Sequence, residues 1–412
     1  MERDPSGMQL FLLFAAVFID LLGFGIIIPN LPFLVREFTP LDSPVSAEIH
    51  YTLIVAVFSL MQFIFAPIWG AVSDRVGRKP VIVIGLGGSV IGFGIFGLAT
   101  DLSFLYFSRT IAGIFTAATL TVANAYIADV SPPEKRGANF GLIAAAFGLG
   151  FAIGPGIGGL LGSLSFANLE GYQLAAFFAS LLSLLNMLAA IPFLPESLID
   201  RKEGWDIRLP ILQTASLKEY GNVLWYILIF ALVGLGFSNF IAVFPLYAVD
   251  LSQIGELELG YYFTYAGLII FFTQTVLIRP LLRKFGEEIV LKTGVFLIGL
   301  GFFTLTLAPT FWWFFLTNIP LLFGISFVNP SSTSLISRST PRHRQGEVLG
   351  IQQGWSSFSR ILGPLFATGL LLVTIPRYIF YLNSLLFLII FLIAWKVTGI
   401  SQIPETAVLI CK

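Results

Sequence analysis

Charged residues are scarce in this sequence. Asp, Glu, Lys and Arg make up 11% of its 412 residues, whereas 56% are hydrophobic; ordinary globular domains carry about 25% charged residues. A chain of this composition cannot present a mainly polar surface to water, so we expect a lipid bilayer to be its main solvent. The formal net charge is zero and no basic tail is present, which gives no support to a nucleic-acid partner.

Cysteine and histidine are nearly absent. The only cysteine is Cys411, and the two histidines, His50 and His343, lie at the ends of apolar runs or in loops. These counts exclude a disulfide framework and a thiolate metal site, and they leave a membrane-embedded enzyme without a nucleophile and base. A P-loop lysine motif is also missing. Two G-x-G-x-x-G matches, at 92–97 and 154–159, fall inside apolar runs, where a dinucleotide-binding turn cannot form.

Twelve long apolar runs dominate the chain instead. Each has about 20 residues, enough to cross a hydrocarbon core about 30 Å thick. Unpaired backbone groups are costly in lipid and the runs show no apolar/polar alternation, so we expect an all-α polytopic membrane protein with twelve transmembrane helices. The predicted spans lie near residues 8–35, 49–71, 80–99, 102–128, 138–162, 172–194, 222–248, 258–280, 289–308, 311–337, 347–373 and 377–396.

The basic residues predict the orientation. With both termini in the cytoplasm, most of the 23 Lys and Arg residues fall in cytoplasmic segments, and only Arg36 and Arg377 fall in outer loops. We therefore expect a multi-pass protein of the plasma (cytoplasmic) membrane with both termini cytoplasmic. We expect it to work as a monomer within the lipid bilayer.

An internal repeat divides the chain. The segment 131–137 (SPPEKRG) is matched by 340–346 (TPRHRQG), and Gly154-Pro155 is matched by Gly363-Pro364, each at an offset of 209 residues. A constant register over such distances indicates two structural copies.

The repeat predicts two pseudo-symmetric six-helix halves around a central cavity. The N-terminal half is residues 1–195, the C-terminal half is 222–412, and the polar segment 196–221 is a cytoplasmic linker. Parallel repeats of this kind place the ligand site near the bilayer midplane, where the halves meet.

Three motifs carry a resemblance to a known family. The turn 70–80 (GAVSDRVGRKP) is similar to the signature G-x-L-a-D-r-x-G-r-k, with Val72 where leucine is usual. Residues 150–159 match the antiporter signature G-x-x-x-G-P-x-x-G-G, and 20–29 (DLLGFGIIIP) resembles the first span of tetracycline-type exporters. The chain thus resembles the major facilitator superfamily, and within it the twelve-span drug/proton antiporters that include tetracycline and multidrug efflux proteins.

This resemblance implies a secondary active transporter and not an enzyme. The expected activity is proton-coupled export of a hydrophobic or amphipathic, drug-like small molecule by alternating access, as in antibiotic resistance. A proton gradient drives it and no cofactor or metal is needed. A lipid or glycolipid flippase, or a sugar or organic-anion carrier of the same fold, is the alternative, because two buried cations, Arg109 and Arg360, exceed the one buried acid. A non-transporting receptor or scaffold is a third possibility.

Asp20 is the only acidic residue well inside a predicted span. A carboxylate there is expensive and normally faces a cavity or a partner. We expect Asp20 to carry the proton, with Arg109, predicted at a similar depth in span four, as its electrostatic tuner. A simple helix–helix hydrogen bond is the alternative for Asp20, and a contact with Asp101 in the outer loop is the alternative for Arg109.

Five residues of the 70–80 turn are assigned to a cytoplasmic conformational gate: Gly70, Asp74, Arg75, Gly77 and Arg78. In the family the aspartate of this loop holds the two halves together, and Arg78 at i+4 is placed to pair with Asp74. Positive-inside charge alone explains Arg75 but not Asp74. In the second copy Arg283 takes the place of Asp74, so the gate is expected to be one-sided.

Small and polar residues complete the candidate site. An antiporter-type hinge is predicted at Gly150, Gly154, Pro155, Gly158 and Gly159, although ordinary small-residue packing would use the same residues. The candidates for the substrate cavity are Gln62, Asn124, Asn239, Gln274, Asn329, Gln353, Trp355 and Arg360. Amides inside membranes join helices more often than they bind ligands.

Overall fold

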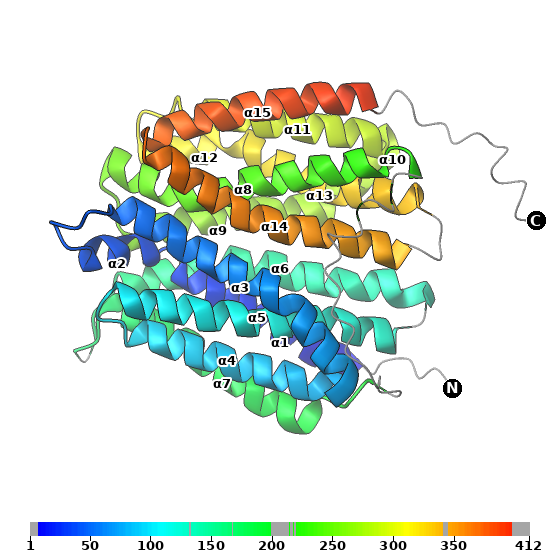
Figure 1. Cartoon of the computed structure of the whole chain (residues 1–412), viewed down its shortest axis with the longest axis horizontal. Coiled ribbons are helices and arrows are strands. Elements are labelled where there is room, and N and C mark those ends of the chain that lie inside the picture. Colours follow the sequence, from blue (N-terminus) through cyan, green and yellow to red (C-terminus); the bar gives the residue numbers. More distant parts are fainter. Residues whose placement is uncertain are drawn as a thin grey trace, which may run out of the picture.

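The computed structural model describes residues 7–131, 133–166, 168–198, 214, 217, 220–340 and 345–397. These residues form long helices that run side by side (Figure 1). Within these ranges the only β-pairing is an isolated bridge between Phe166 and Leu169. The predicted all-α fold is confirmed. Most of the predicted linker 196–221, and Cys411, lie outside the described residues.

The helices follow one another with short connections. In chain order they are α1 (Gly7–Ile27), α2 (Leu31–Phe38), α3 (Ala47–Val76), α4 (Arg78–Gly97), α5 (Leu102–Val130), α6 (Pro133–Gly162), α7 (Gly171–Phe193), α8 (Val223–Ser252), α9 (Glu256–Phe272), the π-helix η2 (Thr273–Leu277), α10 (Ile278–Phe285), α11 (Glu287–Leu305), the 3₁₀-helix η3 (Phe311–Trp313), α12 (Phe314–Thr317), α13 (Ile319–Arg338), α14 (Gln345–Leu371) and α15 (Pro376–Val397).

Ten of the described helices are long and apolar enough to cross a membrane, counting α9, η2 and α10 as one. The helices at the fifth and eleventh predicted spans, α6 and α14, have 30 and 27 residues. In α6 the stretch Gly148–Gly162 is an apolar helical segment. The protein is therefore a multi-pass membrane protein, and the count of twelve remains a prediction for these two helices.

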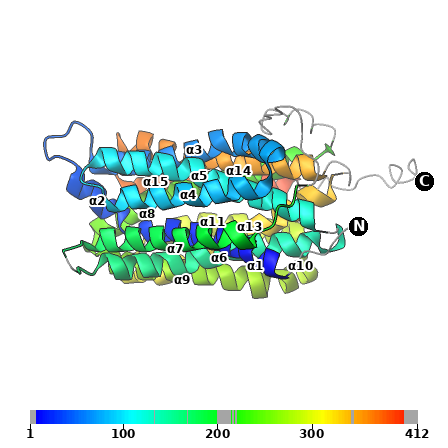
Figure 2. The same cartoon turned by 90° about the horizontal axis from the view of Figure 1, so that it is seen from below.

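Two halves with the same helix packing make up the bundle. In the first half α1 packs on α6 and α4 packs on α5; in the second half α8 packs on α14 and α11 packs on α13. Figure 1 shows the two halves side by side, and in Figure 2 the N-terminal half lies in front of the C-terminal half. Contacts of α6 with α9 and of α3 with α14 join them. The start of α1 and the end of α15 lie at the same end of the bundle (Figure 1).

The first span is shorter than predicted. The sequence suggested one helix over 8–35, but α1 ends at Ile27 and a turn precedes α2. Pro29 has no N–H to continue the helix, and the Asn30 N–H bonds instead to the carbonyl of Ile27. The Asn30 amide donates to the free carbonyl of Ile26 at 3.0 Å and to the carbonyl of Gly158 at 3.1 Å. The turn is thus satisfied by a side chain that also fixes α1 to α6.

Two other spans contain irregular turns that the hydropathy pattern did not indicate. The predicted helix 311–337 is interrupted at Asn318, just before Pro320. The π-helix Thr273–Leu277 precedes Pro280, whose missing N–H leaves a carbonyl four residues earlier without its usual partner. Hydropathy reports only how apolar a run is, whereas these turns depend on where the prolines fall.

Candidate functional site

Asp20 lies inside the N-terminal half, between α1, α4 and α5. Its side chain is buried, with 1% of the residue exposed. Ser89 of α4 donates its hydroxyl to Asp20 Oδ1 at 2.5 Å, and Thr116 of α5 lies beside the carboxyl group. Oδ2 accepts no hydrogen bond from any described residue. The carboxyl group therefore faces neither bulk water nor acyl chains, and one of its oxygens is available to a proton or a new donor.

Glycines on α4 bring Ser89 and Thr116 to this position. A Cβ added to Gly85 would lie 2.6 Å from Thr119 Oγ1, and one added to Gly92 would lie 3.2 Å from the Ala112 Cβ. Such spacing lets the backbones of α4 and α5 approach closely. Ser89 lies between these two glycines, so the same close packing that joins α4 to α5 delivers the hydroxyl to Asp20.

Arg109 is buried in α5, with 3% of the residue exposed. Its guanidinium lies over the rings of Phe58 and Phe96, at 5.8 and 5.2 Å, and donates only a long hydrogen bond of 3.5 Å to Ser108 Oγ. Its Nε has no hydrogen-bond partner among the described residues. Cation–π contacts with these two rings thus stabilise the guanidinium, as an ion pair with a carboxylate would elsewhere.

The direct couple expected between Arg109 and Asp20 is not present in this structure, where no described hydrogen bond or ion pair joins them. The α5 residue beside Asp20 is Thr116, seven residues past Arg109 and so roughly 10 Å further along the helix. The alternative contact with Asp101 is not seen either. Asp101 instead caps α5 by accepting from the backbone N–H groups of Ser103 and Phe104.

A small cavity of about 30 Å³ adjoins Arg109 where the two halves meet. Its walls come from α1, α3 and α5 of the first half and from Ile241 of α8. The Tyr51 hydroxyl donates to the Ile241 carbonyl at 3.3 Å across this junction. The space holds about two waters at most, so the central cavity is nearly closed at this level.

Polar contacts close the same end of the bundle. Arg36 of α2 bonds to Asp250 of α8 at 2.5 Å and to Glu48 of α3 at 3.5 Å. Thr52 and Thr368 share a hydrogen bond of 2.5 Å between α3 and α14. These contacts join the halves at the end predicted to face outward.

The predicted gate residues form a charge cluster at the other end. Arg78 donates to Asp74 at 2.6 Å and to Asp129 of α5 at 2.9 Å. It also donates to Ser73 Oγ at 2.6 Å. These contacts join α3, α4 and α5 within the first half. Arg75 lies partly exposed in the last turn of α3.

Glu196 completes this cluster and was not assigned a role from the sequence. Its carboxylate accepts from the backbone N–H groups of Arg78 at 2.8 Å and Lys79 at 3.2 Å, which caps the first turn of α4. Gly77 lies between α3 and α4 at φ 113°, and a Cβ there would collide with Glu196. Gly70 has more room, since its nearest contact is 3.7 Å away at Thr121. Glu196 follows the end of α7 and lies 118 residues from Arg78 in the chain, so no local sequence signal indicated this contact.

The hinge glycines pack in two directions. A Cβ on Gly154 would lie 2.7 Å from the Leu22 carbonyl of α1, and one on Gly150 would lie 3.0 Å from the Leu21 Cβ. Gly158 also abuts α1 and has no room for a Cβ. Gly159 instead faces the other half, where an added Cβ would lie 2.9 Å from the Gly260 Cα of α9.

Pro155 also lies at this double contact. Its ring touches Gly25 of α1 and its carbonyl lies 2.7 Å from the position of a Cβ on Gly260. Close packing is therefore plain at these residues, and movement about them remains a proposal.

The candidate cavity residues separate into two groups. Asn239 accepts a hydrogen bond of 3.3 Å from Asn383, which joins α8 to α15, and Trp355 donates to Thr214 Oγ1 at 2.9 Å. Asn124 donates to the Leu120 carbonyl on its own helix. For Asn239, helix joining is the role that the contacts show.

The remaining candidates are exposed or partly exposed, as Asn124 and Trp355 are. Asn329 and Gln353 are exposed, and Gln62 and Gln274 are partly exposed. Arg360 donates to Ser356 Oγ at 3.3 Å and to Ser357 Oγ at 2.9 Å, both on α14.

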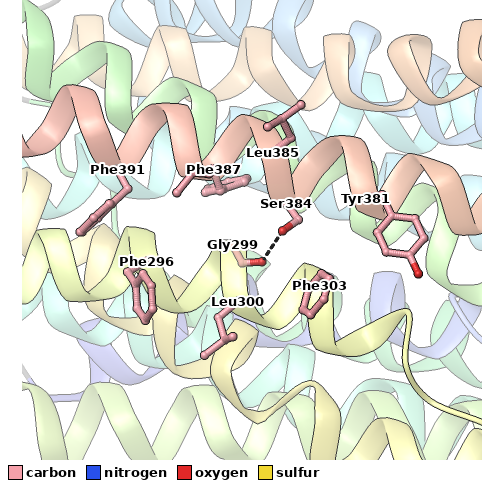
Figure 3. Close-up of a pocket in the computed structure, with 10 residues that line it drawn as sticks. Phe296, Gly299, Leu300, Phe303, Tyr381, Ser384, Leu385, Phe387 and Phe391 are labelled. Atoms are coloured by element: carbon pink, nitrogen blue, oxygen red, sulfur yellow. Dashed lines mark hydrogen bonds between the residues drawn. The ribbon is translucent and has the colours of Figure 1, made fainter.

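A pocket larger than the cavity beside Arg109 lies elsewhere. Figure 3 shows a groove of about 340 Å³ between α11 and α15, walled mainly by Phe and Leu side chains. Its one marked polar contact is the Ser384 hydroxyl donating to the Gly299 carbonyl at 2.9 Å. Phe303 and Leu388 are about half exposed at its rim. These features fit a lipid-covered flank and not the polar site described above.

Comparison with known proteins identifies the scaffold. Residues 13–364 and 275–407 match the model of the Major Facilitator Superfamily. The chain is 32% identical to the tetracycline resistance protein, class C, of Escherichia coli over 89% of this chain and 90% of that protein. It is 26% identical to the quinolone resistance protein NorA of Staphylococcus aureus over 90% of this chain and 92% of that protein.

Solved structures share the fold at lower identity. The human organic anion transporter MFSD10 (TETRAN) superposes with a TM-score of 0.72 at 23% identity, covering 95% of this chain and all of that one. A POT family transporter in complex with 5-aminolevulinic acid gives a TM-score of 0.77 at 14% identity, covering 95% and 96%. These likenesses concern the fold alone.

Proposed function

The chain belongs to the major facilitator superfamily, and from that premise we propose that it exports a hydrophobic or amphipathic, drug-like small molecule in exchange for protons. Relatives named for tetracycline and quinolone resistance support the substrate type. The bundle closed by Arg36–Asp250 at one end supports alternating access between two half-bundles. No cofactor enters this cycle. We place the protein in the plasma membrane as a monomer, with both termini cytoplasmic.

The observation that carries the proton coupling is the Asp20 carboxyl group. It is buried, it has one hydrogen-bond donor in Ser89, and its second oxygen is unpartnered among the described residues. An ionised carboxylate in such a place is poorly stabilised, and a proton on Oδ2 removes the charge. Loading and release of that proton therefore change the electrostatic free energy of the N-terminal half, which can favour one orientation of the halves over the other.

The cytoplasmic cluster is proposed as the gate of this cycle. Arg78 joins Asp74 and Asp129 at the ends of α3, α4 and α5, so it makes one end of the N-terminal half a rigid unit. Gly158 and Gly159 let α6 contact both α1 and α9 closely. A rigid half that moves against the other along α6 and α9 is the motion that alternating access needs.

Replacing Asp20 with Asn tests the proposal. Purified protein in proteoliposomes with a pH-sensitive dye inside is expected to move protons when a drug-like substrate is added, and Asp20→Asn is expected to lose this movement while still binding substrate. Asp101→Asn is the matched control, because Asn still caps a helix start and Asp101 lies outside the bundle interior. Full coupling in Asp20→Asn, with normal folding, would reject Asp20 as the proton carrier.

A further inference from the structure

Arg360 has no acidic partner among the described residues. Arg36, Arg78 and Arg338 all form ion pairs with carboxylates. Arg360 bonds only to Ser356 and Ser357 of its own helix. A guanidinium without a carboxylate inside a membrane span is expensive, and its planar fork is suited to a carboxylate.

Two faces of α14 are covered by other helices. Ser359 packs against Gly234 of α8, and Thr368 hydrogen-bonds to Thr52 of α3. Successive residues of a helix are about 100° apart, so these contacts leave two uncovered arcs between them. The side chains on the two arcs differ sharply in polarity.

The first arc is apolar and faces lipid: it carries Leu362, Leu365 and Phe366, which are 37%, 43% and 47% exposed. The second arc carries Gln353, Ser357 and Arg360. The exposed apolar arc faces lipid, and a polar arc inside a membrane normally faces a cavity, so the second arc, on the opposite side of the helix, faces the space between the halves. Gln353 is exposed there, so this space is open on the side of α14 that begins at Gln345.

Aromatic side chains lie on the opposite side of α14 from Arg360. Phe358 packs against Phe63 of α3 at 5.9 Å and against Trp355 at 5.9 Å. Arg109, the other buried cation, differs because aromatic rings cover it beside a cavity of only about 30 Å³. Arg360 is therefore the cation placed to meet a ligand that enters this conformation.

We propose that Arg360, with Ser357 and Gln353, binds the carboxylate of an amphipathic substrate that enters the space between the halves. The guanidinium and hydroxyl supply donors, and the Gln353 amide supplies a further one. The proposal rests on the proposed export function, since it names the substrate class for that cavity. The equivalent residue in the first half is Phe151, so acid recognition belongs to the second half alone.

A carboxylate-bearing quinolone and its methyl ester provide matched probes for the purified full-length protein in detergent. Wild type is expected to bind the acid about tenfold more tightly than the ester, as befits one charge-assisted bidentate contact. Arg360→Gln is expected to remove this preference and to leave ester affinity within about twofold. Arg360→Lys keeps the charge but loses the fork, so it is expected to retain about a third of the preference.

Equal binding of acid and ester by wild type, or an unchanged preference in Arg360→Gln, would overturn the proposal. If Arg360→Gln does not fold, Ser357→Ala serves instead and is expected to reduce the preference about threefold; no reduction counts against the site. Transport separates this result from the export function. If a pH gradient drives transport of the ester by both wild type and Arg360→Gln, the export function is upheld whatever the preference for acid over ester. If wild type prefers the acid but a pH gradient drives no transport, the binding site is upheld and the export function is rejected.

Discussion

The two halves share their helix packing but differ in what they bury. The first half places a polar group at the centre of its bundle: Asp20, Ser89, Thr116 and Thr119. The register of 209 residues pairs these positions in the second half with Ile229, Ile298, Ile325 and Val328. The fold is therefore stable with an apolar core at these positions, so the polar group in the first half is not needed for packing. Its presence in one half alone supports the proposed role of Asp20 in proton coupling.

The ion pairs at the cytoplasmic helix ends, unlike the buried polar group, are kept in both halves. Arg78–Asp129 joins α4 to α5 at 2.9 Å, and at the same register Glu287–Arg338 joins α11 to α13 at 2.7 Å. The signs are exchanged but the contact is kept. What the two halves share at this point is a neutral pair between equivalent helix ends, whereas the additional acid Asp74 distinguishes the first half.

The largest effect is expected at Gly158 of the first half, where α6 packs directly on α1. Gly158→Leu would push α6 from α1, because no room exists even for a Cβ there, and we expect loss of most folded protein. Gly369→Leu on α14 meets nothing within 4 Å and is expected to fold normally. Fluorescence-detected size-exclusion chromatography of the two variants makes the test; equal yields would show that close α1–α6 packing is dispensable.

The second expected effect concerns the polar group around Asp20. Ser89→Ala removes the hydroxyl that donates to the carboxylate and is expected to lower proton-coupled transport about tenfold. Ser180→Ala removes a serine that bonds α7 to α4 at the Val90 carbonyl and does not contact Asp20, so it is the matched control. Initial rates of dye-detected proton movement compare them. Similar losses in both variants would reduce Ser89 to a packing residue.

The charge pairs are expected to differ in their contribution to stability. The Arg78 side chain is 9% exposed and bonds two carboxylates, whereas that of Arg338 is 71% exposed. Arg78→Gln is therefore expected to cost about 3 kcal/mol and Arg338→Gln less than about 1 kcal/mol. The readout is the melting temperature in detergent. A shift of the same size in both variants would remove this distinction between the halves.

The smallest expected effect is at the ion pair that joins the halves. Arg36→Asp loses its bond to Asp250, and the population open at that end is expected to rise about threefold. Adding Asp250→Arg restores an ion pair of opposite polarity and is expected to reverse most of the change. The measurement is labelling of Ile241→Cys by an impermeant maleimide in a Cys411→Ser background. Labelling that the second substitution does not reduce would exclude the pair as a closure.

Much of the fold could be predicted because hydropathy and the repeat act over long stretches. The apolar runs located the helices, and the motif residues Asp74 and Arg78 proved to be paired. The breaks near Asn30 and Asn318 were missed, since each depends on a proline and on a distant side chain or carbonyl. Asp20 could be identified because an acidic residue inside an apolar run stands out in the sequence. Its partner Ser89 could not, because serine is common in membrane spans and does not stand out.

The sequence alone determined the solvent, the helical class, the two copies and the identity of the rare buried charges, since each of these is a local property of composition or spacing. Only the tertiary structure decided which groups meet. It placed Ser89 against Asp20, put aromatic rings around Arg109, and left Arg360 bonded to serines of its own helix. The physical reason is that such contacts depend on the rotation and depth of each helix, which are fixed by glycine packing between helices distant in the chain.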